Sequence, residues 1–593
     1  MYCNGDNPKT MAPDRWCMKH MWASWRYPGR WRIFRFDDRL LLILIAIIVG
    51  ICAGLAAVAL NRALIAMLEW LHPVRHYWWG FVLPAIGAAL SSIFLHNIVN
   101  EGPGHGVPEV IYSVSRYGGL MRLRSSFSRL ISSCLTIGSG GSAGPEAPVV
   151  MSGAAIGSNI AKFFSLNDRQ RVALVGCGAA GAISSIFNAP IAGMVFTIEV
   201  ILGEWKAINI IPVAIASVAG AQISRILQGN QIAFEHRLFH IDLLDITACF
   251  GLALLCALAS ILLTRLLRGS ARLSGSWQIP LWARAAAGGC AVGCIGILLP
   301  AVLGEGYHSI REMINGTFMQ GIGIVALLVL AKIVATSLTL GTGGSGGIFA
   351  PSLVIGSLVG LAYHRALVFM WPTVGWVNEG CFALLGMAGL ISGMLQAPLT
   401  GIFLIVEITG GYEVMLPLII VSAISTTACH YIEPVSFYLK ELVEKGQLLR
   451  PGTDAPVLSD MSIEELIETD CLCVHQNMLL RDFIDIVKRS RRNYFPVEDD
   501  RTGRFLGMIH LDDIRPYMFN IGMYDALMLG QIMNTGVDVV TAEDDLTEVL
   551  QRMDARRLFS MPVVSNDRFM GMISKATLLD QYRKELMVQT SGE

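Results

Sequence analysis

Between residues 40 and 431 the chain is a succession of apolar segments, and this run limits the possible folds more than any other feature. Many segments are shorter than the roughly 20 residues that a helix needs to cross a bilayer, and glycine or proline interrupts them. In a membrane such breaks occur only where protein or a water-filled cavity satisfies the freed backbone groups. Broken helices are typical of proteins that bind a substrate at mid-membrane. The segments are 40–66, 80–99, 126–136, 148–165, 172–183, 190–203, 208–227, 241–268, 281–302, 320–338, 352–371, 381–394, 398–409 and 415–431.

The composition agrees with a membrane protein. Only 15% of the residues are charged, against roughly 25% in soluble proteins. The net charge is −1, so no overall field would recruit nucleic acid, and the lipid bilayer is the expected surrounding. The 13 cysteines are scattered without a CxxC pair, which predicts neither a metal site nor a disulfide framework.

The apolar region is an internal repeat. Three matches occur in the same order at nearly the same spacing, which predicts two homologous halves. GSGGSAGPEAP (138–148) aligns without gaps on GTGGSGGIFAP (341–351), GAISSIFNAPIAGMVFTIE ending at Glu199 matches GLISGMLQAPLTGIFLIVE ending at Glu407, and GHGVPEV from Gly104 resembles GEGYHSI from Gly304.

The glycine-rich loops of this repeat predict an anion site. Loops at Gly104, Gly138 and Gly341 lead into apolar segments, and transporters built from two halves commonly place helix N-termini, with their positive dipole ends, around an anion. Neither copy carries the Lys-Ser/Thr of a nucleotide P-loop. No nucleophile–base pair accompanies the loops, so a covalent reaction is not predicted.

The chain also divides along its length. The arginine-rich flank before Leu40 predicts a retained first membrane helix with the N-terminus in the cytoplasm, and after about Arg450 the composition becomes that of a soluble protein. VEDDRTGRFLGMIHLDDI (497–514) is echoed by VVSNDRFMGMISKATLL (563–579). We expect a cytoplasmic segment 1–38, a membrane domain 39–435 with halves 39–230 and 240–435, a linker 436–455, and an α/β pair 456–593 made of repeats 456–520 and 528–590.

Four motifs in order resemble those of the CLC family of chloride channels and transporters. They are GHGVPE (104–109), GPEAP (144–148), GIFAP (347–351) and SFYLKEL (436–442). The C-terminal repeats resemble the CBS pair that many members carry. The resemblance covers nearly the whole chain and implies an all-α multi-pass domain of about eighteen helices in two inverted-repeat halves, followed by an α/β CBS pair. It also implies a homodimer with one pore in each subunit.

By position, the resemblance makes Glu146 the gating glutamate, which occupies the anion pathway when it is ionised. The sequence agrees, because a lone carboxylate in an apolar, glycine-rich repeat is costly, and its repeat partner is Phe349. Structural capping of a helix is the alternative. The resemblance further implies that backbone N–H groups around Ile348 and Phe349 hold chloride and that the Tyr438 hydroxyl closes the site, although Tyr438 could instead be an interfacial anchor.

The chain departs from the family pattern at the first element, where His105 replaces a serine that coordinates the anion. The imidazole could donate to the anion or carry charge at low pH. Alternatively it points away, and the backbone at Gly106 and Val107 is the ligand. Around the gating position, Pro145 replaces a basic residue and Ala147 a glycine.

A second departure bears on mechanism. Exchangers of the family usually have two adjacent glutamates after F-N-A-P, the second of which receives protons from the cytoplasm; here Glu199 is followed by Val200. Valine cannot relay a proton, so we expect a passive chloride channel. The alternative is a coupled chloride/proton antiporter, since some exchangers lack that glutamate. A CBS-regulated cation transporter, which would need clustered carboxylates, and a membrane anchor for a nucleotide sensor are more distant alternatives.

The CBS pair resembles modules that bind adenine nucleotides through a Ser/Thr and an Asp after the G-x-I strand. The first repeat has His510 and Asp513 at these positions, and the second has Ser574 and Thr577. Each set is incomplete, so nucleotide binding and a purely structural role in dimerisation both stay open. No cofactor is required by the predicted function. The single-chain design favours a bacterial inner membrane with both termini in the cytoplasm.

Overall fold

The computed structural model describes residues 38–444 and 462–581, apart from positions 76, 78, 103–105, 204, 206, 230–233, 235–238, 491, 542, 545 and 557. Three predicted features therefore lie outside the described residues. They are the N-terminal segment except for its last residue, the residue His105, and the later part of the linker. The chain divides into two compact units, whose boundary falls between Cys429 and His430. Each unit is described by itself.

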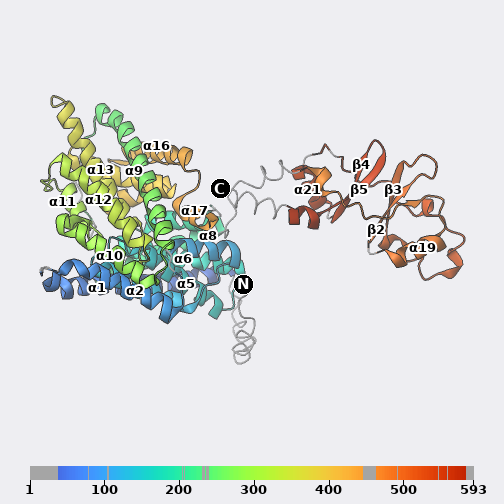
Figure 1. Ribbon diagram of the computed structural model, residues 1–593, viewed down its shortest axis with the longest axis horizontal. Coiled ribbons are helices and arrows are strands. Elements are labelled where there is room, and N and C mark those ends of the chain that lie inside the picture. Colours follow the sequence, from blue (N-terminus) through green and yellow to red (C-terminus); the bar gives the residue numbers. More distant parts are fainter. Residues whose placement is uncertain are drawn as a thin grey trace, which may run out of the picture. The chain divides into compact units, whose positions relative to one another are not determined.

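The first unit is built of helices from two successive stretches of the chain (Figure 1). The first stretch contains α1 (Asp38–Arg75), α2 (Leu83–Ile93), α3 (Val107–Tyr117), α4 (Ser128–Gly138), α5 (Glu146–Phe163), α6 (Asp168–Phe187), α7 (Pro190–Phe196), the π-helix η4 (Thr197–Leu202) and α8 (Ala207–Gln228). The second contains α9 (Leu243–Gly275), α10 (Leu281–Leu298), the short η5 (Pro300–Val302), α11 (Tyr307–Ile314), α12 (Ile322–Gly341), α13 (Phe349–Met370), α14 (Glu379–Leu395), α15 (Pro398–Thr409) and α16 (Met415–Ile432), within which the unit boundary falls. The next helix, α17 (Phe437–Glu444), belongs to the second unit.

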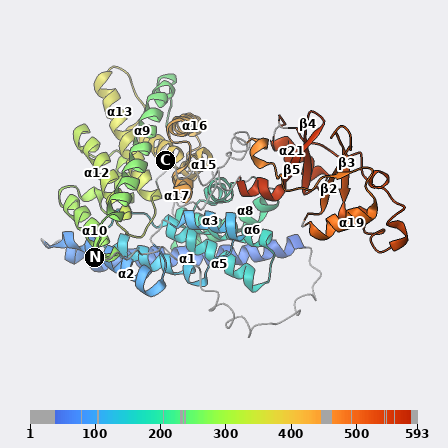
Figure 2. The same cartoon turned by 45° about the vertical axis from the view of Figure 1, so that its right-hand side comes forward.

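These seventeen α-helices of residues 38–444 confirm the predicted all-α domain. Within the described residues, nine helical stretches are long and apolar enough to cross a membrane, while α7, α14 and α15 are apolar but shorter. Figure 2 shows α1 as one long rod, and it packs against α5, α6 and α8.

The two stretches contact each other reciprocally, as two halves related by an approximate two-fold axis should. The Gly144 N–H donates to the Gly347 carbonyl at 2.8 Å, and the Gly347 N–H returns a bond to the Gly144 carbonyl at 2.7 Å. Helix α2 packs on α10 and α7 packs on α15, so each helix meets its own repeat partner. Because the two glycines form an antiparallel bridge, the halves meet head-on at the loops that precede α5 and α13.

Close glycine contacts hold each half together, and they too are repeated. A Cβ on Gly153 of α5 would lie 2.2 Å from the carbonyl oxygen of Gly178 in α6, and a Cβ on Gly356 of α13 would lie 2.4 Å from that of Gly386 in α14. Small residues let membrane helices approach to backbone contact, where packing replaces the hydrophobic effect as the source of stability. This packing holds α5 against α6 and α13 against α14.

The second unit carries two α/β repeats. The first has β1 (Val474–His475), α19 (Leu480–Arg489), β2 (Tyr494–Glu498), β3 (Phe505–His510) and α20 (Leu511–Ile514), and the second has α21 (Leu546–Ala555), β4 (Ser560–Ser565) and β5 (Arg568–Ser574). β1 pairs parallel to β2, and β2 is antiparallel to β3. The bridge between Val540 and Val563 repeats the pairing of Val474 with Val497. Two separate apolar cores lie under α19 and α21.

Candidate functional site

The glycine-rich loops bring the starts of α5 and α13 together. A Cβ on Gly347 would approach the Cβ of Ala147 to 3.0 Å, and a Cβ on Gly144 would lie only 2.1 Å from Glu146 Oε2. Glycine is therefore needed at 144 to leave room for the carboxylate of the residue two positions later. Two helix N-termini, each with a partial positive charge, share one small space.

Glu146 lies in that space. It is the first residue of α5 and is 1% exposed. Its Oε2 accepts from the Ala350 N–H in the first turn of α13 at 3.4 Å, and its Oε1 accepts from the Tyr307 hydroxyl at 2.5 Å. The negative carboxylate thus occupies a place at the start of α13 where a small anion would be stabilised by the same backbone groups.

The first predicted element lies beside the same loops. A Cβ on Gly106 would be 2.9 Å from the carbonyl oxygen of Ala147, next to Glu146. The Gly106 N–H, however, donates to Glu109 Oε2 at 2.8 Å as part of the α3 cap. This amide is engaged within its own helix, and the anion-ligand role of Gly106 stays a prediction. Val107, the first residue of α3, is 1% exposed, and His105 lies outside the described residues.

Ile348 and Phe349 form the start of α13 and are both buried. The Phe349 ring lies against Phe187 and Phe196, with ring centroids 5.5 and 6.0 Å apart. The position next to the glutamate is therefore aromatic and apolar. Tyr438, in α17, is buried and packs on Phe437. It belongs to the second unit, and its predicted role as an anion ligand stays a prediction.

Glu199 is bound to backbone amides of the other half. Its carboxylate accepts from the Leu399 N–H at 3.2 Å and from both the N–H and the hydroxyl of Thr400 at 2.7 Å. Reciprocally, Glu407 accepts from the N–H groups of Ile191 at 3.0 Å and Ala192 at 2.8 Å. Each glutamate caps the short helix of the opposite half. Val200, the predicted lost relay position, follows in η4 and is half-buried.

Sequence reasoning overlooked Tyr307, Glu305 and Lys332. Lys332 is 1% exposed, and its Nζ donates to the carbonyls of Val302 at 2.8 Å and Gly304 at 2.9 Å. The alignment of GHGVPEV with GEGYHSI contained a signal, because it sets Glu305 and Tyr307 opposite His105 and Val107. A lone lysine in the apolar segment 320–338 was a second signal.

The comparisons with known proteins agree with this geometry. A family profile described as "Voltage gated chloride channel" matches residues 87–430, more than half of the chain. The chain belongs to this family, called CLC. A second profile, "CBS domain", matches residues 463–520 and 529–584. The chain is thus a multi-pass membrane protein of a family that transports chloride and related anions, with two CBS domains.

Two bacterial relatives match the CLC domain over most of their own length. A protein of Ralstonia nicotianae named as a ClcB-like chloride channel protein is 28% identical over 68% of this chain and 96% of its own length. The H(+)/Cl(-) exchange transporter ClcA of Vibrio cholerae is 30% identical over 64% of this chain and 84% of its own length. The crystal structure of a slow cyanobacterial Cl-/H+ antiporter shares the fold, with a TM-score of 0.63 and 22% identity over 70% of this chain and 99% of that chain.

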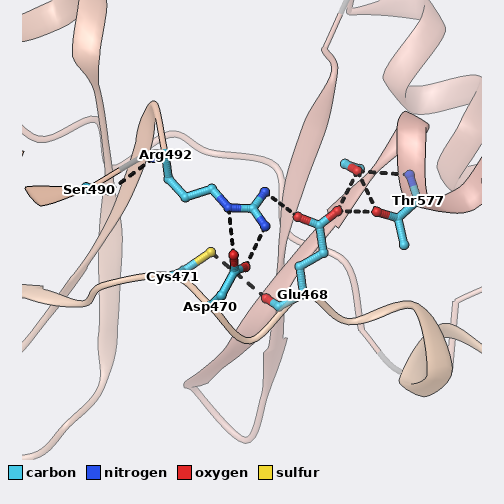
Figure 3. A network of polar contacts seen from close by, with 7 residues as sticks. Glu468, Asp470, Cys471, Ser490, Arg492 and Thr577 are labelled. Carbon is cyan, nitrogen blue, oxygen red and sulfur yellow. Dashed lines mark hydrogen bonds and ion pairs between the residues drawn. The ribbon is translucent and has the colours of Figure 1, made fainter.

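In the CBS pair, one of the two predicted nucleotide positions is filled by a carboxylate of the chain itself (Figure 3). The hydroxyls of Ser574 and Thr577 both donate to Glu468, the former at 2.6 Å. Arg492 of the first repeat joins Glu468 to Asp470. Burial by itself would raise the pKa of Glu468, but these hydroxyls and the guanidinium outweigh it and hold the pKa below its ordinary value.

The other predicted position differs. Asp513 accepts from the His510 N–H at 3.2 Å, and the imidazole lies against the Tyr494 ring with centroids 4.6 Å apart. Backbone pairing shows that Asn534 is the counterpart of Glu468, because Glu468 bridges to β5 and Asn534 bridges to β3. The position at His510 and Asp513 therefore has a neutral amide, Asn534, where the position at Ser574 and Thr577 has the carboxylate of Glu468.

Proposed function

We propose that this CLC protein exchanges chloride for protons across the membrane and that Glu146 carries the proton. The observation behind this proposal is the position of its carboxylate, buried on the first-turn amide of α13. Chloride and an ionised carboxylate would compete for those backbone groups, because both are stabilised by the same partial positive charge. Glu146 would then occupy the anion pathway in alternation with chloride.

Protonation of Glu146 couples the two ions in this scheme. A neutral carboxylic acid loses most of its attraction to the helix N-terminus. It leaves the pathway, and chloride takes its place. When the acid later loses its proton on the other side of the membrane, the charged form returns and displaces chloride. In each half-cycle the Glu146 carboxylate thus either binds a proton or occupies the anion pathway.

The relatives support exchange over the passive channel that we expected from Val200. Vibrio ClcA is named as an exchange transporter and is 30% identical to this chain. The contacts of Glu199 supply no replacement relay, because this carboxylate is engaged with Leu399 and Thr400. Passive chloride conduction is therefore the second candidate, and the apolar side chain at Val200 is the observation that favours it.

Chloride efflux from proteoliposomes, with simultaneous recording of external pH, tests the proposal. An outward chloride gradient should drive protons inward against their own gradient in a constant ratio to chloride. Chloride efflux that requires valinomycin and moves no protons would establish the passive channel instead.

Substitutions of Glu146 supply the matched variants. Glu146→Gln and Glu146→Ala should both abolish proton movement and the pH dependence of chloride flux, while chloride itself still passes. Unchanged pH dependence in both variants would exclude Glu146 as the proton carrier. Glu407→Gln, which alters a buried carboxylate away from the start of α13, is the control for nonspecific effects.

For the CBS pair we propose that the position at Ser574 and Thr577 does not accept a nucleotide. Glu468 already accepts from both hydroxyls, and its negative charge would repel a phosphate. A nucleotide would instead bind at the position of His510 and Asp513. The contacts of Glu468 favour a structural role for the second repeat.

A further inference from the structure

Tyr307 stands between the buried Glu146 and a cavity. It is the first residue of α11, and its hydroxyl donates to Glu146 Oε1 at 2.5 Å. The same residue lines a cavity of about 780 Å³. A proton entering Glu146 from that cavity would meet the Tyr307 hydroxyl first.

The cavity has an acidic wall and apolar sides. Glu305, His308 and Glu312 line it together with Tyr307, and leucines of α1, α10 and α12 complete it. Glu305 interacts electrostatically with both Glu146 and the Lys332 ammonium. A carboxyl group thus lies two residues before the tyrosine, on the same cavity and within range of the buried glutamate.

Comparison of the two halves shows which residues around Tyr307 belong to a framework common to both halves and which occur only in the second half. Lys332 donates to the Val302 carbonyl at 2.8 Å, and its repeat counterpart Arg129 donates to the Gly102 carbonyl at 2.9 Å. A buried cation that holds the glycine-rich loop is therefore common to both halves. The carboxyl group of Glu305 and the phenol of Tyr307 are not common to both halves, since the first half has histidine and valine at these positions. The common framework therefore does not require this polar pair.

The cavity also lies toward the opposite end of α1 from Val200. The first turns of α8, just after η4, pack through Val213 against Leu42 near the start of α1. The cavity is lined by Leu68, which is farther along α1 by about 39 Å at 1.5 Å per residue. A proton route through the cavity would serve the side of the membrane that Val200 does not face.

We propose that Glu305 and Tyr307 form the proton route between this cavity and Glu146. The step rests on the proposed role of Glu146. The Tyr307 O–H bond breaks as its proton passes to the Glu146 carboxylate, and Tyr307 takes a proton from the Glu305 carboxylic acid, directly or through water in the cavity. The two transfers at Tyr307 are concerted, so Tyr307 stays neutral throughout. Glu305 is reprotonated by a hydronium ion from solution, and the net change is one proton moved from solution to Glu146.

The charged and titratable groups around this route are few. Of the described residues, Tyr307 and Glu305 contact or influence Glu146 from the α11 region, and Lys332 does so from α12 through Glu305. His308 and Glu312 face the cavity and form an i,i+4 pair at 3.3 Å. Because the side chains of His308 and Glu312 are 87% and 40% exposed whereas Tyr307 donates directly to Glu146, their substitution should alter the proton supply less than substitution of Tyr307.

Tyr307→Phe and Glu305→Gln test the route in proteoliposomes. Each should lower proton flux by about a hundredfold, the range expected when a positioned proton donor is lost, while chloride flux continues. The double variant should lose no more proton flux than each single variant, since Tyr307 and Glu305 act on one route. Tyr363→Phe is the control, because the Tyr363 hydroxyl donates at 3.0 Å to the Ala248 carbonyl elsewhere in the same unit.

The outcomes separate this inference from the proposed function. If the wild type moves no protons with chloride, exchange fails, and the route is then judged by the pH dependence of chloride efflux, which Tyr307→Phe should still reduce. If the wild type exchanges protons and both variants keep its stoichiometry and pH dependence, the route is wrong. If Tyr307→Phe fails to fold, Glu305→Gln tests the route by itself.

Discussion

Truncation of Glu199 and Glu407 distinguishes a helix cap from a proton relay. Each carboxylate accepts from two backbone N–H groups at the start of the opposite half's short helix. Leaving one buried N–H without an acceptor costs about 1–3 kcal/mol. Each alanine variant should therefore lose about 2–6 kcal/mol of unfolding free energy. Leu399 and Ile191 are partly exposed, so the lower half of that range is expected.

The assay combines heat stability and ion coupling. Glu199→Ala and Glu407→Ala, purified in detergent, are heated and the folded fraction is measured by size exclusion, beside the glutamine variants that retain one acceptor oxygen. Both alanine variants should lose stability because each carboxylate accepts from two backbone N–H groups, and Glu199→Ala should lose somewhat more because Glu199 also accepts from the Thr400 hydroxyl. Protein that survives should keep the wild-type ratio of protons to chloride.

An asymmetric result would refute the capping argument. If Glu199→Ala abolished proton coupling at wild-type stability while Glu407→Ala changed nothing, Glu199 would be the proton relay despite its backbone contacts. Glu199→Gln then decides whether charge or hydrogen bonding matters, since it keeps the shape of the side chain and removes the charge.

Three further predictions follow from packing and from the CBS contacts. Gly153→Ala and Gly356→Ala should each lower the yield of folded protein, since the added methyl meets a backbone carbonyl, whereas Gly269→Ala, which has open space, should not; heated size exclusion measures this. The lowered pKa of Glu468 means that its contacts stabilise the CBS pair at neutral pH and that this contribution is lost as pH falls through that lowered value. Limited proteolysis of the full chain should thus show an acid-labile CBS pair, and Glu468→Gln should be more labile already at neutral pH. Asp513→Ala should remove any adenosine triphosphate binding measured by calorimetry; equal binding in this variant would place the nucleotide elsewhere.

Most of the membrane domain was predictable because its signals are local or repeated. Apolar runs predicted the long helices, and the helix predicted over 241–268 appears as α9 (Leu243–Gly275). The shorter α3 (Val107–Tyr117) and α11 (Tyr307–Ile314) lie in none of the predicted segments. Among the predicted segments, the longest difference is at the end of α1, which continues from residue 66 to Arg75. There the polar side chains of an amphipathic turn hide the hydrophobic signal. Glu146 was predictable because a carboxylate in an apolar repeat is costly without a role.

Repetition also predicted the two halves and the two CBS repeats. It could not predict which polar atoms meet, because those contacts join residues far apart in the chain. The Tyr307 hydroxyl reaches Glu146 across 161 positions, and Glu468 reaches Ser574 across 106. No local pattern encodes such a pair.

The sequence by itself determined that this protein is a two-fold repeat of broken membrane helices followed by a CBS pair, and it predicted an anion pathway near Glu146. Only the tertiary structure decided that the Gly106 N–H donates within the cap of its own helix and that the Tyr307 hydroxyl donates to Glu146. It also decided that Glu199 and Glu407 each cap a short helix of the opposite half. The reason is physical. Helix formation and membrane insertion depend on side chains within a few turns, whereas a buried hydrogen bond depends on how two complete halves pack.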